Sequence, residues 1–111
     1  MICNQGDIVK LDFDPVKGHE QAGYRPALVV SRSFFNQNFR QAVVCPITSR
    51  SKPFPPLRVA LDSRTATQGF IICDQVRTID LAARNPQYIE SIPEDLLEEA
   101  LQRVIAIFDG E

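Results

Sequence analysis

A set of polar side chains lies at the ends of apolar runs along this 111-residue chain. Its members are His19, Glu20, Arg25, Thr48, Ser49, Asp74, Gln75 and Arg77. If the runs are strands of one sheet, their ends can converge and bring these groups into a single polar site. Each residue also has an ordinary structural explanation, such as an exposed arginine, a turn hydroxyl or a solvated carboxylate at a strand end.

The residue types disfavour several kinds of catalytic site. One histidine and scattered carboxylates leave no convincing metal shell, so we expect no metal and no other cofactor. The sequence has no glycine-rich phosphate loop. A serine or cysteine triad would need His19 beside a nucleophile, and the chain has neither a nucleophile-elbow sequence nor a cysteine in a polar setting.

Short runs that alternate between apolar and polar residues, or that are rich in β-branched residues, predict the strands that position this set. The predicted strands cover residues 6–13, 25–31, 41–48, 57–61 and 69–76. A long polar loop over residues 14–24 separates the first two, and a short helical turn is expected within residues 33–40. Five or more short strands in so small a chain favour a curled barrel or a sandwich.

Only the C-terminal part of the chain has a clear helical pattern. Ser91 and Glu94 have the spacing of a capping box, with Pro93 between them. One apolar stripe follows at helical spacing: Leu96, Leu97, Ala100, Leu101, Val104, Ile105 and Phe108. We therefore expect a core helix with a solvated acidic face.

Charge is distributed unevenly in a chain whose formal net charge is −2. Residues 1–58 hold eight Lys and Arg against four Asp and Glu, a balance of +4. Residues 59–111 hold four against ten, a balance of −6. This asymmetry permits a basic working face on an acidic protein.

Length and composition predict one domain over residues 1–111, since cores usually divide only beyond roughly 250 residues. No stretch approaches the ~20 apolar residues needed to cross a bilayer, so we expect a cytoplasmic protein without membrane contact. The three cysteines have no Cys-x-x-Cys spacing. Cys45 and Cys73 lie in apolar runs, which favours buried, reduced thiols.

Several separated motifs occur in the order and spacing of a known family. They are Gly6-Asp7-Ile8, Asp12-Phe13-Asp14-Pro15, the run GHEQAGYRPALVVS over residues 18–31, Phe35-Asn36, Pro46-Ile47-Thr48-Ser49, Gly69, the run DQVRTID over residues 74–80, and Ala83-Arg84. With these motifs the chain strongly resembles the MazF/PemK toxins, and the resemblance covers nearly all of it.

The resemblance implies a mainly β fold, an SH3-like small β-barrel with a C-terminal α-helix, as in the MazF and CcdB folds. It implies an endoribonuclease toxin that cuts single-stranded RNA at short sequence motifs without a metal, usually as a homodimer, and that is held in check by an antitoxin. In the reaction implied, the ribose 2′-OH attacks the adjacent phosphate and leaves a 2′,3′-cyclic phosphate and a 5′-OH. DNA lacks that hydroxyl and should not be cut.

The resemblance also suggests roles for single residues. Arg25 and Thr48 are the expected catalytic pair, because a guanidinium fork holds phosphate oxygens and a hydroxyl can donate to them. Glu20, His19 and Asp74 all match positions implicated in proton transfer. In the branch with the most similar Gly-His-Glu-Gln loop, Asp74 would be the base and an arginine two residues earlier the acid. This chain has Ile72 at that position, so acid and base stay unassigned, and Arg25 or Arg77 could supply the missing charge.

Contacts to unpaired bases are expected from the loops, where flat side chains and polar edges can meet them. The candidates for binding RNA are His19, Ser49, Arg50, Lys52, Phe54, Gln75 and Arg77. A mobile proline-rich connector is an alternative explanation for the segment around Phe54. Two other functions stay open: a non-catalytic barrel toxin that binds a protein such as gyrase, and a DNA-binding regulator, which the lack of a recognition-helix pattern disfavours.

Overall fold

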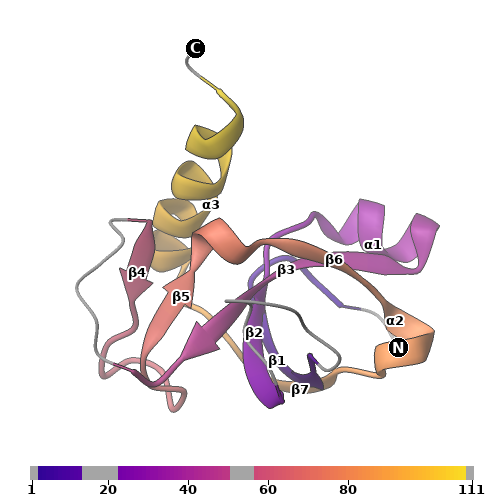
Figure 1. Cartoon of the computed structure of the whole chain (residues 1–111), viewed down its shortest axis with the longest axis horizontal. Helices are drawn as coiled ribbons and strands as arrows, with labels where there is room; N and C mark the ends of the chain where they lie inside the picture. The colour runs from indigo at the N-terminus through magenta and orange to yellow at the C-terminus, as the bar shows by residue number, and fades with distance from the viewer. Residues whose placement is uncertain (1–2, 14–22, 51–56, 110–111) are drawn as a thin grey trace.

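The computed structural model describes residues 3–13, 23–50 and 57–109 (Figure 1). In chain order its elements are β1 (Asp7–Asp12), β2 (Tyr24–Val29), α1 (Ser33–Phe39), β3 (Gln41–Thr48), β4 (Arg58–Ala60), β5 (Phe70–Ile72), a 3-10 turn (Cys73–Gln75), β6 (Arg77–Asp80), α2 (Leu81–Arg84), β7 (Gln87–Ser91) and α3 (Glu94–Phe108). The short helix α1 and the C-terminal helix α3 lie where the sequence predicts them.

Seven antiparallel strands form one curled sheet in the order β4-β5-β3-β2-β1-β7. Strand β6 lies off this path and also pairs with β3. One edge of β3 therefore has two partners, because Ile47 and Thr48 pair with β5 whereas residues 41–44 pair with β6. The expected mainly β architecture with a C-terminal helix is confirmed.

The two faces of the sheet bury separate apolar clusters, as expected when side chains alternate along strands. The α3 face packs against the first half of α3 and includes Ile8, Leu28, Cys45, Ile47, Val59, Ile71, Leu96 and Ala100. The far face includes Val9, Leu11, Phe13, Ala27, Val29, Val44, Ile79 and Leu81. Each side chain of β2 and β3 can therefore be assigned to one face by its register.

The strand predicted over residues 69–76 is interrupted, so this expectation was wrong in its second half. Strand β5 ends at Ile72, the 3-10 turn follows, and β6 begins only at Arg77. The turn is needed because the chain must move along the edge of β3 from its pairing at Ile47 to its pairing at Val44. Asp74 thereby lies in an exposed turn instead of a strand.

The start of α3 also differs from the sequence expectation. Ser91 is the last residue of β7 and pairs with Asp7, so it cannot cap the helix. Its hydroxyl lies 3.0 Å from that of Tyr88, and the N-cap position is occupied by Pro93, which has no capping side chain. Glu94 and Asp95 still place negative charge in the first helical turn, where the helix dipole favours it.

The apolar stripe of α3 is buried only in its first half. Leu96 and Ala100 are buried, whereas Ile105 is exposed and Phe108 is 77% exposed. Figure 1 shows the last turns of α3 extending beyond the sheet. The expected core helix is therefore packed in its first half, whereas its C-terminal end presents apolar side chains to solvent.

Candidate active site

Arg25 and Thr48 lie at the neighbouring ends of β2 and β3, on the far face of the sheet. The two strands pair through Val29–Val44, Leu28–Cys45 and Ala27–Pro46. The same register continued by two residues puts Arg25 opposite Thr48, on the face shared by Ala27 and Pro46. Strand pairing stops before that point, so the two strand ends diverge and leave an opening between the two residues.

Thr48 is almost completely buried, with 1% of its surface exposed, so it is not a surface turn hydroxyl. Its Oγ1 atom accepts a hydrogen bond from the Arg50 N–H at 3.2 Å. A hydroxyl that accepts from an N–H keeps its own proton to donate elsewhere. The side chain is thus held in one place with one donor available, while Ser49 and Arg50 beyond it are exposed.

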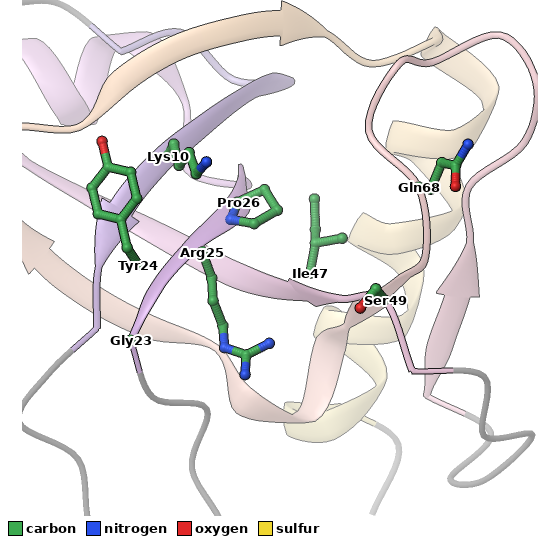
Figure 2. Close-up of a pocket in the computed structure, with 8 residues that line it drawn as sticks. All are labelled: Lys10, Gly23, Tyr24, Arg25, Pro26, Ile47, Ser49 and Gln68. Atoms are coloured by element: carbon green, nitrogen blue, oxygen red, sulfur yellow. The ribbon is translucent and has the colours of Figure 1, made fainter.

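Arg25 is half-buried, and its side chain leaves the strand on the side opposite Tyr24 and Pro26 (Figure 2). It follows Gly23, whose carbonyl accepts a hydrogen bond from the Phe13 N–H at 2.9 Å. That bond joins β1 and β2 at the base of the segment that carries His19 and Glu20. These two residues lie outside the described part of the chain, as do Lys52 and Phe54.

The later members of the predicted site lie farther along β3. Asp74 is exposed and Gln75 half-buried in the 3-10 turn, which runs beside the part of β3 that neither β5 nor β6 pairs. Arg77 pairs with Val44, four residues before Thr48, or about 13 Å along the strand. Its guanidinium lies over the Phe13 ring at 5.6 Å. The structure thus places Arg25 and Thr48 on one face at neighbouring strand ends, and Asp74, Gln75 and Arg77 line the adjoining edge.

Arg58 is a candidate that the sequence analysis missed. It pairs with Ile72 across β4 and β5, on the same face as the Thr48–Phe70 pair. Its Nε atom is buried, and no hydrogen-bond partner reaches it within the described residues. A buried donor without a partner is costly, and such atoms often await a ligand or water. The alternating pattern of residues 57–61 indicated a strand, but only the β4–β5 register places Arg58 on this face.

A cavity of about 340 Å³ lies in the opening between the diverging ends of β2 and β3. The residues that line it are Lys10, Gly23, Tyr24, Arg25, Pro26, Ile47, Ser49 and Gln68 (Figure 2). Lys10, Pro26 and Ile47 belong to the α3 face by register, so the cavity opens on the side of the sheet opposite the Arg25 guanidinium.

Cys3, Cys45 and Cys73 are all buried with free thiols, as expected for the last two, so none is exposed to a substrate. A hydrogen bond with Cys73 is the main cause, and burial the second, that raises the pKa of Cys45 far above the ordinary thiol range. The reactive thiolate form is therefore suppressed there. Within the described ranges, no three His, Cys, Asp or Glu side chains gather in a way that could hold a metal ion.

Residues 4–108 match the family model described as PemK-like, MazF-like toxin of type II toxin-antitoxin system. The chain belongs to this toxin family. It is 40% identical over 109 residues to the endoribonuclease PemK of Escherichia coli, covering 93% of this chain and 80% of the relative. The expected resemblance to the MazF/PemK toxins is thereby confirmed.

Solved structures of this family have the same fold. The MazF crystal structure from Deinococcus radiodurans is 33% identical, with a TM-score of 0.90 and 96% of each chain covered. A MazE–MazF crystal structure from the same organism matches at 33% identity and a TM-score of 0.84, again over 96% of each chain. No helix in the described part of this PemK/MazF-like toxin is long and apolar enough to cross a membrane.

Proposed function

We propose that this protein is the toxin of a type II toxin–antitoxin system and a metal-independent endoribonuclease that cuts single-stranded RNA at short sequence motifs. The observation that carries the proposal is the β2–β3 register, which places Arg25 and Thr48 on one face of the sheet at the diverging ends of the two strands. A permanent cation beside a held hydroxyl donor suits a phosphate that gains negative charge during reaction. Membership of a family with relatives named endoribonucleases supports the same activity.

In the proposed reaction the ribose 2′-oxygen forms a bond to the adjacent phosphorus, and the bond from phosphorus to the 5′-oxygen of the next nucleotide breaks. The products are a 2′,3′-cyclic phosphate and a 5′-OH. The 2′-OH proton passes to a base, and the leaving 5′-oxygen gains a proton. Arg25 binds the non-bridging phosphate oxygens as a fork of donors, and the Thr48 hydroxyl donates a hydrogen bond to one of them.

Asp74 and Glu20 are the proposed proton-transfer groups, and mutating each in turn would show which of them accepts the 2′-OH proton. Asp74 has the exposure that a base needs in order to reach an incoming ribose. Ser49, Arg50, Gln75 and Arg77, with His19, Lys52 and Phe54, are proposed to bind the RNA on either side of the scissile bond. No cofactor is required for this chemistry.

Arg58 is proposed to add a second cation to the phosphate-binding face. Its strand is two strand spacings from β3, about 10 Å, and an arginine side chain can cover most of that distance. Position 72, which the resemblance associates with an arginine, holds a buried isoleucine directly opposite Arg58. The positive charge therefore comes from the neighbouring strand.

The proposed partners are a cognate antitoxin and a second copy of the chain. The MazE–MazF structure of Deinococcus radiodurans contains such an antitoxin and supports the first partner. We propose that a disordered acidic segment of the antitoxin covers the basic strand ends. Exposed apolar side chains at the end of α3, among them Ile105 and Phe108, are suited to a symmetric dimer contact. We take residues 1–111 as one toxin domain that works in the cytoplasm.

The proposal is tested by incubating the protein with a long, unstructured transcript in excess chelator and mapping the 5′ ends of the fragments. Cleavage should continue in chelator, leave 5′-OH ends, and stop when the scissile nucleotide carries a 2′-deoxyribose. Activity that disappears in chelator and returns with a divalent ion would contradict the mechanism. A folded wild-type protein that cuts no RNA would favour a toxin that binds a protein target.

A further inference from the structure

The cavity between β2 and β3 exists because the sheet splits at that point. Strand β2 stays paired with β1 as far as Tyr24, and β3 stays paired with β5 as far as Thr48. Between β2 and β3 themselves, pairing ends at Ala27–Pro46. The split connects the two faces of the sheet, with Arg25 and Thr48 on the far face and the cavity on the α3 face.

The cavity has flat apolar surfaces and a polar rim. Pro26 and Ile47 form the middle of it in Figure 2, with Tyr24 and Lys10 at one side and Gln68 at the other. The Tyr24 ring is 56% exposed, and the Lys10 ammonium lies 5.2 Å from its centroid. Aromatic and apolar walls with a few polar groups are the usual features of sites that bind planar organic groups.

The backbone on both sides of Gln68 is held in place. The next residue, Gly69, has a φ of +120°, and a Cβ atom there would lie 2.0 Å from the Thr48 carbonyl oxygen. Only glycine permits this close approach. On the other side of Gln68, Glu90 accepts hydrogen bonds from the Thr67 N–H and hydroxyl, each at 2.8 Å. The exposed side chain of Gln68 therefore extends from a fixed stretch of backbone beside the split.

We propose that this cavity binds one unpaired base of the RNA, next to the phosphate held by Arg25 and Thr48, and that Gln68 reads the edge of that base. The inference rests on the proposed endoribonuclease function and extends it to the origin of its sequence preference. RNA bases are recognised by stacking on aromatic side chains and by hydrogen bonds to their edges. Gln68 offers an amide donor and acceptor together, and Lys10 can neutralise a flanking phosphate.

The split explains how one nucleotide reaches both the phosphate position beside Arg25 and the cavity on the α3 face. A strand of RNA that passes the ends of β2 and β3 can place its phosphate on the Arg25 side and its base on the cavity side. Arg25 lines the cavity and points its guanidinium away from it, so phosphate and base contacts meet at one residue (Figure 2). Cleavage would then depend on which base enters the cavity.

The test maps 5′ fragment ends on a long, unstructured transcript for the wild type and for Gln68→Ala, and measures binding for Tyr24→Ala. The binding probe is an oligonucleotide spanning a mapped site with a 2′-deoxyribose at the scissile position. Gln68→Ala should lose at least about tenfold of the base preference at one motif position while it still cuts. Tyr24→Ala should weaken binding about tenfold, as expected for one lost base–aromatic contact, and Tyr24→Phe should bind normally.

Two matched controls separate this role from general surface effects. Tyr88 on β7 is 58% exposed, close to the value for Tyr24, and lies opposite Val9 on the far face. Gln37 is an exposed glutamine on α1. Tyr88→Ala and Gln37→Ala should leave both the motif and the affinity unchanged. Thermal unfolding confirms that every variant is folded at the assay temperature.

Wild-type motif and affinity in both Gln68→Ala and Tyr24→Ala, with an active wild type, would overturn the cavity assignment and leave the proposed function standing. A folded wild type that neither binds nor cuts RNA would refute the proposed function, and the base assignment with it. If Tyr24→Ala weakens binding of the antitoxin and leaves RNA binding and motif unchanged, the cavity belongs to the antitoxin and the assignment to RNA is wrong.

Discussion

Thr48 allows a sharp test of the proposed chemistry, because its hydroxyl can be removed with little change of shape. In Thr48→Val a methyl group of similar size replaces Oγ1, so the side-chain shape is kept but the bond from the Arg50 N–H is lost. Arg50 is exposed, so water can bond to the freed N–H, and the loss should cost about 1 kcal/mol of folding free energy. A domain stable by about 5–15 kcal/mol stays folded after such a loss.

The cleavage rate should fall much more than the stability. Removing one preorganised donor from a phosphate or oxyanion site typically costs on the order of 100-fold in rate, about 3 kcal/mol. Thr48→Ser is the matched control, because it keeps the hydroxyl and loses one buried methyl group, worth about 0.8 kcal/mol. The serine variant should therefore lose about as much stability as the valine variant. It should nevertheless cut within about tenfold of the wild type.

The assay is single-turnover cleavage of an oligonucleotide that contains one mapped site, with enzyme in excess so that chemistry limits the rate. Thermal unfolding of the same samples gives the stability change. If Thr48→Val cuts within about threefold of the wild type, the hydroxyl takes no part in the reaction and the assignment is wrong. If Thr48→Ser is as inactive as Thr48→Val, the methyl group positions the strand end and the hydroxyl is not the decisive part.

Three further substitutions test other parts of the site and its support. Arg25→Ala should lower the cleavage rate about 100-fold or more, and Arg25→Lys should also be poor because it loses the bidentate fork; a near wild-type rate for Arg25→Lys would argue against that geometry. Arg58→Gln should weaken RNA binding and reduce the slope of the logarithm of the RNA-binding constant against log salt by about 0.7. Arg32→Gln at the start of α1 should change neither quantity. Equal salt slopes for the two variants would show that Arg58 does not contact the RNA. Burial alone would raise the pKa of Glu90, but hydrogen bonds from Thr67 and Ala66 lower it. The contribution of Glu90 to stability is therefore present above the ordinary carboxyl pKa and is lost as pH falls through the lower folded pKa. Glu90→Gln should therefore lower Tm at neutral pH, and the difference should shrink in acid; a constant difference would contradict it.

The positions of the main strands were predictable because each has a pattern that burial imposes. In β1, Val9 and Leu11 alternate with Lys10 and Asp12, and in β3 a continuous apolar run is buried on both faces. The family resemblance selected Arg25 and Thr48 as the expected catalytic pair, and this assignment stays a prediction. Their mutual placement needed only the antiparallel β2–β3 pairing, which short neighbouring strands commonly adopt.

Strand β7 and the start of α3 could not be predicted for related reasons. Four of the five residues of β7 are exposed, so no apolar alternation marks it, and it forms only because β1 offers an unpaired edge. Once Ser91 is taken into that pairing it is no longer available as a helix cap. The capping-box spacing was present in the sequence, but tertiary pairing overrode the local preference.

The two features that distinguish this site depend on long-range register and not on any local pattern. Arg58 lies on the same face as Thr48 only because it pairs with Ile72, and the cavity opens only because β2 and β3 stop pairing after Ala27–Pro46. Pro46 has no N–H to donate and, with Cys45, forms the stretch of β3 that β5 and β6 leave unpaired, so fewer inter-strand hydrogen bonds are available at this point. Gly69 ends the loop between β4 and β5 and lets that loop approach the Thr48 carbonyl closely. A proline and a glycine within the predicted strands therefore lie at the split, beside the proposed phosphate and base sites.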